Sequence, residues 1–174
     1  LGPHGMVSEA LILHMKSPAL HGALNMIFRY GITEDEDYAE KVYPFLRGVA
    51  DFWEKDLVLR DGVYHVTGDG MHERTEENIR ENGEPEDPVN TLGYLKTFFS
   101  WMPRISEALN LDAEKRDKWR TISENLAPYP KGTVRDIQNN PTLWKEVDVK
   151  LEELLPEELL DKEIFYDEGI GGKW

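Results

Sequence analysis

Residues 37–58 read DYAEKVYPFLRGVADFWEKDLV and carry the pattern that decides the fold. Apolar side chains recur there every three or four residues: Val42, Phe45, Leu46, Val49, Phe52 and Trp53. This spacing predicts an amphipathic helix with one buried face. Four acidic residues at 34–37 place its start after Thr33, because negative charge is stabilised at a helix N-terminus. Pro44 is expected to kink the helix or divide it.

A second helix is expected just before this one. Ser17 and Pro18 are typical of an N-cap and a first helical position, and Gly31 marks the expected end. The sequence thus predicts an antiparallel helical hairpin over residues 17–56. Its packing residues are expected to be Leu24, Ile27, Phe28, Leu46, Val49 and Trp53.

The pattern changes after Asp56. Short apolar runs on either side of Asp61-Gly62 predict a small β-hairpin near residues 57–66. Residues 67–88 lack apolar periodicity, and a loop of that length inside a compact domain is typical of a functional segment.

A second helical hairpin is predicted over residues 90–126. Its first helix, 90–109, is expected to bury Leu92, Leu95, Phe98, Phe99, Met102, Ile105 and Leu109. Asp112 is expected to cap the next helix, which buries Trp119, Ile122 and Leu126. The segment 131–174 is less regular, with a helix expected over 141–155, one more turn over 156–160 and a short strand over 164–166.

Composition narrows the class of protein. The chain has 174 residues and a formal net charge of −14, which repels phosphate backbones and anionic lipid headgroups, so neither nucleic acid nor a membrane is expected as a partner. It has no Cys, which excludes disulfides and thiolate metal sites. The histidines lack neighbouring ligands at metal-site spacing, and we expect neither a metal nor another cofactor. The cellular compartment stays open.

Several stretches resemble the helical hairpins of six-hairpin (α/α toroid) glycoside hydrolases, most closely the α-L-fucosidase-like enzymes and related uncharacterised glycosidases. They are Asp37-Tyr38, Tyr43-Pro44-Phe45-Leu46, Ala50-Asp51-Phe52-Trp53, Glu107 to Asp112, and Pro128-Tyr129-Pro130. The resemblance implies a mainly all-α fold of consecutive hairpins, with chemistry carried by loops at one end. Since such toroids are much longer, we expect residues 1–174 to form a single partial domain.

The resemblance also implies a general acid in the loop 67–88. Glu73 is the residue that matches it, and Asp69 is the second choice. His72, Arg74 and Asn90 are the expected substrate-binding residues, although Asn90 also suits the N-cap of the helix that follows. Inverting glycosidases need a second group on the opposite face of the sugar, about 6.5–9.5 Å from the acid. That group is expected beyond Trp174, so the isolated chain is expected to be inactive and to self-associate or to contact missing parts of its parent.

The sequence and the resemblance bring three functions into consideration. The first is an inverting glycoside hydrolase acting on a terminal sugar of an oligosaccharide. The second is a non-enzymatic helical scaffold that binds a protein partner through its acidic surface. A phosphorylase of the same clan is disfavoured, because Asp69 would repel phosphate in the Thr67 to Gly70 turn.

Overall fold

The computed structural model describes residues 15–69, 86–139 and 155–165. Helices make up 66% of these residues, and two small two-stranded antiparallel sheets accompany them. The prediction of a mainly helical chain is therefore confirmed, whereas the described residues show no toroid. The chain divides into two compact units. The helical unit comprises residues 16–67 and 90–127, and the second unit comprises the rest of the chain.

The first helical hairpin consists of α1 (Pro18–Thr33) and α2 (Glu36–Asp56). Leu24, Ile27, Leu46, Val49 and Trp53 are buried as predicted. Phe28 is 49% exposed, so its inclusion among the packing residues was wrong. Each residue turns by about 100° around a helix, and this step carries Phe28 to the edge of the buried arc that Leu24 and Ile27 define.

Two boundaries of this hairpin differ from those expected. Helix α1 continues through Gly31 and ends only at Thr33, where Glu34 adopts a left-handed conformation and donates its backbone N–H to Tyr30. Helix α2 starts at Glu36 because the Asp35 side chain accepts a hydrogen bond from the Tyr38 backbone N–H. Pro44 lies within α2, which runs on without division.

The predicted β-hairpin follows, with β1 (Val58–Arg60) antiparallel to β2 (Val63–His65). Asp61 and Gly62 both have positive φ at the turn, as a tight two-residue hairpin turn requires. Tyr64 is buried, and its backbone N–H and carbonyl bond to the carbonyl of Asn125 and the N–H of Ala127. These bonds attach the β-hairpin to the end of the last helix of this unit.

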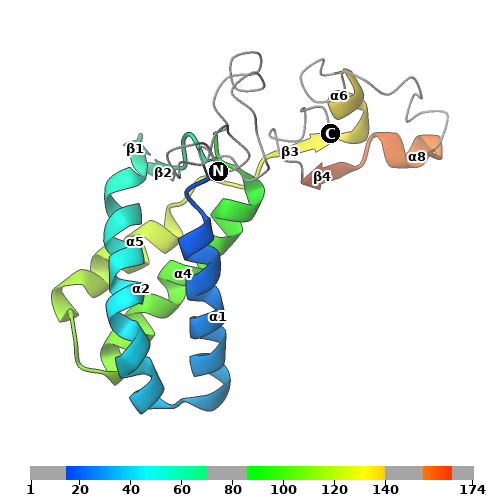
Figure 1. The fold of residues 1–174 in the computed structure, drawn as a ribbon. Coiled ribbons are helices and arrows are strands. Elements are labelled where there is room, and N and C mark those ends of the chain that lie inside the picture. The colour runs from blue at the N-terminus through cyan, green and yellow to red at the C-terminus, as the bar shows by residue number, and fades with distance from the viewer. Residues whose placement is uncertain (1–14, 70–85, 140–154, 166–174) are drawn as a thin grey trace, which may run out of the picture. The chain divides into compact units, whose positions relative to one another are not determined.

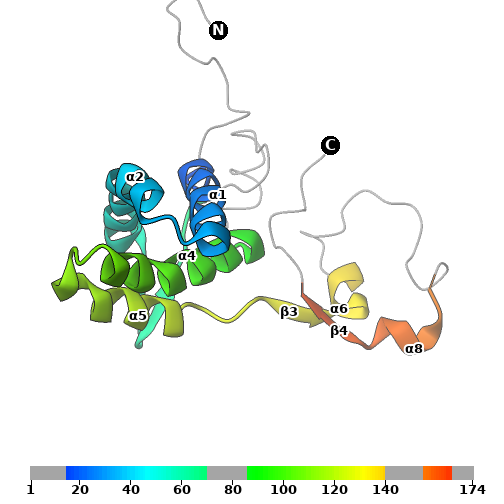
Figure 2. The same cartoon turned by 90° about the horizontal axis from the view of Figure 1, so that it is seen from below.

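The second helical hairpin consists of α4 (Val89–Ala108), the 3-10 helix η1 (Ala113–Lys115) and α5 (Arg116–Glu124). The predicted apolar residues of these helices are buried, except that Leu109 is half-buried. Asp112 precedes η1 but makes no side-chain cap bond, which corrects the expected capping role. Figure 2 shows α1 and α2 in one layer and α4 with α5 in a second layer, so the two hairpins stack on each other.

The second unit holds a further small sheet and two short helices. Strand β3 (Lys131–Thr133) pairs antiparallel with β4 (Glu163–Phe165), which overlaps the strand predicted at 164–166. Helix α6 (Val134–Asn139) was not predicted, while α8 (Glu157–Leu160) matches the predicted turn. Most of the helix expected over residues 141–155 lies outside the described residues.

Candidate functional site

The loop 67–88 is connected to the helical unit at one end of that unit. At this end α1 starts and α2 ends, and Lys16 Nζ bonds both to the Asp56 carboxylate at 2.9 Å and to the Thr67 carbonyl at 2.9 Å. Helix α4 also starts near the start of α1 (Figure 1). Beside this point, His21 of α1 stacks on Tyr94 of α4 with ring centroids 5.6 Å apart. The chain therefore leaves the helical unit and re-enters it at the same end.

Two of the predicted site residues fall within the described structure. Asp69 is fully buried, and it is the only fully buried carboxylate among the described residues. Asn90 is exposed and occupies the second position of α4, because the helix begins one residue earlier than predicted. The N-cap role considered for Asn90 is therefore excluded.

The remaining predicted site residues, His72, Glu73 and Arg74, lie outside the described residues. Their roles stay predictions.

A network of charged side chains joins the two helical hairpins, and sequence reasoning missed it. Asp112 accepts a hydrogen bond from the Tyr43 hydroxyl at 2.8 Å and another from Arg47 Nε at 2.9 Å. Arg47 also pairs with Asp51 one helical turn further along α2. Lys115 Nζ lies 2.8 Å from the Asp51 carboxylate.

Glu54 completes this network. Its carboxylate accepts hydrogen bonds from Trp119 Nε1 at 2.7 Å and from Lys115 Nζ at 3.1 Å. Trp119 is fully buried, so its indole N–H needs such an acceptor. The network contains three carboxylates and two cations, and each carboxylate accepts from at least two donors.

The electrostatics of the network indicate a structural role. Burial, together with the hydrogen bond donated to Asp112, raises the pKa of the Tyr43 hydroxyl. The hydrogen bond from Arg47 lowers the pKa of Asp51, and that from Lys115 adds to it. Burial acts to lower the pKa of Lys115, but its bonds to Asp51 and Glu54 outweigh burial and raise it. Tyr43 and Asp51 are thus held in their ordinary charge states near neutral pH, which does not suit a general acid.

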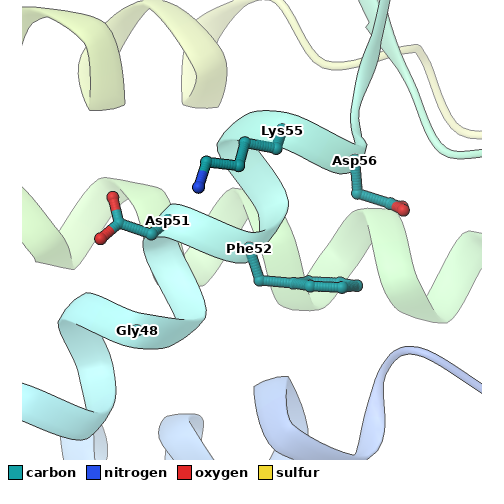
Figure 3. Close-up of a pocket in the computed structure, with 5 residues that line it drawn as sticks. All are labelled: Gly48, Asp51, Phe52, Lys55 and Asp56. Carbon is teal, nitrogen blue, oxygen red and sulfur yellow. The ribbon is translucent and has the colours of Figure 1, made fainter.

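A surface hollow of about 400 Å3 lies on the face of α2 next to this network. It is lined by Gly48, Asp51, Phe52, Lys55 and Asp56. Figure 3 shows the Phe52 ring between the two carboxylates, with the Lys55 side chain extending over the same face. The hollow therefore combines an aromatic surface with hydrogen-bond acceptors and a donor.

One pattern in the sequence indicates the charged network. Arg47, Asp51 and Glu54 recur at helical spacing on α2, beside its buried stripe rather than opposite to it. Such a charged flank indicates a polar contact with another element. Its partners Asp112 and Lys115 are more than 60 residues away, and no local pattern points to them.

Comparisons with known proteins add no assignment. No family model matches the sequence, and no curated protein or solved structure matches it either. Among the described residues, no helix is both long and apolar enough to cross a membrane.

Proposed function

We propose that this chain is a segment of an inverting glycoside hydrolase that removes a terminal sugar from an oligosaccharide. Two successive antiparallel hairpins stacked in layers support the proposal, because this is the repeating unit expected of an α/α toroid. The toroid itself, the sugar and the reaction belong to the proposal.

The observation that carries the proposal is the burial of Asp69 at the start of the loop 67–88. A carboxylate is rarely fully buried unless it is paired, and Asp69 does take part in an interaction. This interaction holds a carboxylate two residues after the helical unit, at the start of the loop. Both junctions of this loop with the helical unit lie at one end, as expected for loops that carry chemistry in a toroid.

In the proposed reaction, Glu73 protonates the glycosidic oxygen as the leaving group departs. A second group on the opposite face of the sugar activates the attacking water, which inverts the anomeric centre. Asp69 is the alternative acid, and Asn90 is exposed and available to bond a sugar hydroxyl.

Hydrolysis of aryl glycosides and oligosaccharides by the protein that contains this chain tests the proposal. Glu73→Gln should reduce kcat by at least about a hundredfold, since general acid catalysis contributes about 10²–10⁴. Glu124→Gln is the matched control, because Glu124 is an exposed residue at the end of α5. Full activity of both Glu73→Gln and Asp69→Asn would exclude the acid assignment.

The alternative is a scaffold that binds a basic protein. The observation in its favour is the turn between α1 and α2, where residues 34–37 are all acidic and all exposed. Binding of a basic partner that weakens with salt, and that is lost when these residues are replaced by Asn and Gln, would favour this alternative.

A further inference from the structure

We infer that the hollow on α2 is a binding site for a neutral sugar ring. None of the residues that line it is offered as a catalytic group, so the inference goes beyond the proposed hydrolysis. It is a shallow, open hollow of about 400 Å3 on the face of one helix, so a ligand bound there would keep part of its own surface in solvent.

Phe52 supplies the stacking surface. Its side chain is 45% exposed although its neighbour Trp53 is fully buried, and the two rings meet edge to face with centroids 5.3 Å apart. This contact orients the Phe52 ring at the edge of the hollow. The electron-rich face of an aromatic ring attracts the weakly positive C–H bonds on one face of a pyranose.

Two carboxylates at opposite sides of Phe52 supply acceptors for sugar hydroxyls (Figure 3). Lys16 holds Asp56 through both carboxylate oxygens at 2.9 Å, while Arg47 and Lys115 hold Asp51. Both side chains remain partly exposed, at 21% for Asp56 and 40% for Asp51. They are therefore fixed before a ligand arrives, and each carboxylate oxygen keeps a lone pair for one.

The mixed charge of the lining selects the class of ligand. Lys16 pairs with Asp56, and Arg47 and Lys115 pair with Asp51, so the hollow and its surroundings offer little net charge to attract an ion of either sign. A neutral polyol can instead donate to the carboxylates and accept from Lys55, so all three polar groups are satisfied. The exposed carbon face of Phe52 adds a preference for a ring over a linear polyol.

Gly48 keeps the hollow open and offers a way to close it. A Cβ built at Gly48 meets no other atom within 4 Å, so Gly48→Leu should fill the hollow without disturbing the helix. Gly22→Leu is the matched control, because Gly22 is also helical, meets no atom within 4 Å and does not line the hollow.

Amide chemical shifts of the ¹⁵N-labelled chain, titrated with methyl α-L-fucopyranoside and with lactose, test the inference. At least one of these sugars should give saturable shifts centred on Gly48, Phe52 and Asp56. Gly48→Leu should weaken this binding by about tenfold or more, and Gly22→Leu should leave it unchanged.

Three results of the sugar titrations would overturn the inference. They are the absence of saturable shifts with both sugars, shifts centred away from α2, and equal affinity in the wild type and Gly48→Leu. Spermidine and inorganic phosphate serve as charged probes, and occupation of the hollow by either one, with neither sugar bound, also overturns it. Because binding is scored without turnover, these outcomes are independent of the Glu73 assignment.

Discussion

Glu54 is the residue at which the two helical hairpins share a partly buried hydrogen bond. Its carboxylate receives the indole N–H of Trp119 at 2.7 Å, and the Trp119 ring is fully buried. We predict that Trp119→Phe lowers the free energy of unfolding by about 1.5–3 kcal/mol, because a hydrogen bond to a charged group is lost. Denaturant unfolding monitored by circular dichroism measures this.

Trp101→Phe is the control for that variant. The Trp101 ring is half-buried and lies beside Arg104, with 5.2 Å between the ring centroid and the guanidinium carbon. Its replacement by Phe weakens an exposed cation–π contact that is worth about 0.5–1 kcal/mol at most. Equal losses in the two variants would mean that ring size, and not the bond to Glu54, sets the effect.

Two helical glycines differ in the space around them, and this difference predicts opposite effects of alanine. Gly48→Ala should raise the free energy of unfolding by about 0.5–1 kcal/mol, since nothing lies within 4 Å of the new Cβ. In Gly31→Ala the Cβ would lie 2.8 Å from the Trp101 ring, so the ring must move and the gain should be lost or reversed. Thermal unfolding of both variants decides this, and a similar gain in both would contradict the close packing of α1 on α4.

At the scale of elements, Asp112 connects α2 to the turn between α4 and α5. It accepts from Tyr43 and Arg47, and all three side chains are at least partly buried. We predict that Asp112→Ala costs about 2–3 kcal/mol, because one phenol and one guanidinium each lose an acceptor. Equilibrium urea unfolding is the measurement.

The matched control for this variant is Asp117→Ala. Asp117 pairs with Arg120 at 2.9 Å, but its side chain is 96% exposed. Exposed ion pairs contribute about 0–1 kcal/mol, so the change should be small. A larger loss in Asp117→Ala than in Asp112→Ala would contradict the role given to the network.

The sequence predicted a helix or turn well where the neighbouring residues alone determine it. The helices α1, α2 and α4 and the Asp61-Gly62 turn each depend on neighbouring residues, and the structure confirms them. The predicted stripes are confirmed only in part, because Phe28, Phe45 and Phe52 are exposed. Sequence reasoning failed where distant residues decide the outcome. Lys131–Thr133 carries no strand pattern and becomes β3 only through its pairing with β4, and Asp112 gives up its capping role for a contact with Arg47.

The same distinction between local patterns and distant contacts applies to the candidate site. The identity of Asp69 as a site residue was inferred from the resemblance, and its full burial is a property that no local pattern gives. The hollow was not predicted, because Phe52 was counted in the apolar stripe of α2 that was expected to form its buried face. Its position one residue before Trp53 turns it by about 100° from the buried face, and only the packed structure shows which of the two rings remains exposed.

At the scale of the whole molecule, the charged network makes the free energy of unfolding depend on pH under both acidic and alkaline conditions. The lowered pKa of Asp51 gives stability that is present above the unfolded value of about 3.9 and is lost as pH falls below it. The raised pKa of Tyr43 gives stability that is present below the unfolded value of about 10 and is lost as pH rises above it. Lys115, also raised, acts in the same direction as Tyr43.

Tyr43 contributes a part of the alkaline loss of stability that a single substitution can test. We predict that Tyr43→Phe lowers stability at neutral pH, because the bond to Asp112 is lost, and that its stability falls less steeply than wild type above pH about 10. Some decline should remain, since Lys115 and Tyr30 also have raised pKa values. Unfolding by urea at a series of pH values measures both effects, with Tyr38→Phe as the control because that ring stacks on Arg29 outside the network. If the stabilities of Tyr43→Phe and the wild type decline in parallel above pH about 10, the Tyr43 phenol does not stay protonated in the folded state. The hydrogen bond from the Tyr43 hydroxyl to Asp112 would then be contradicted.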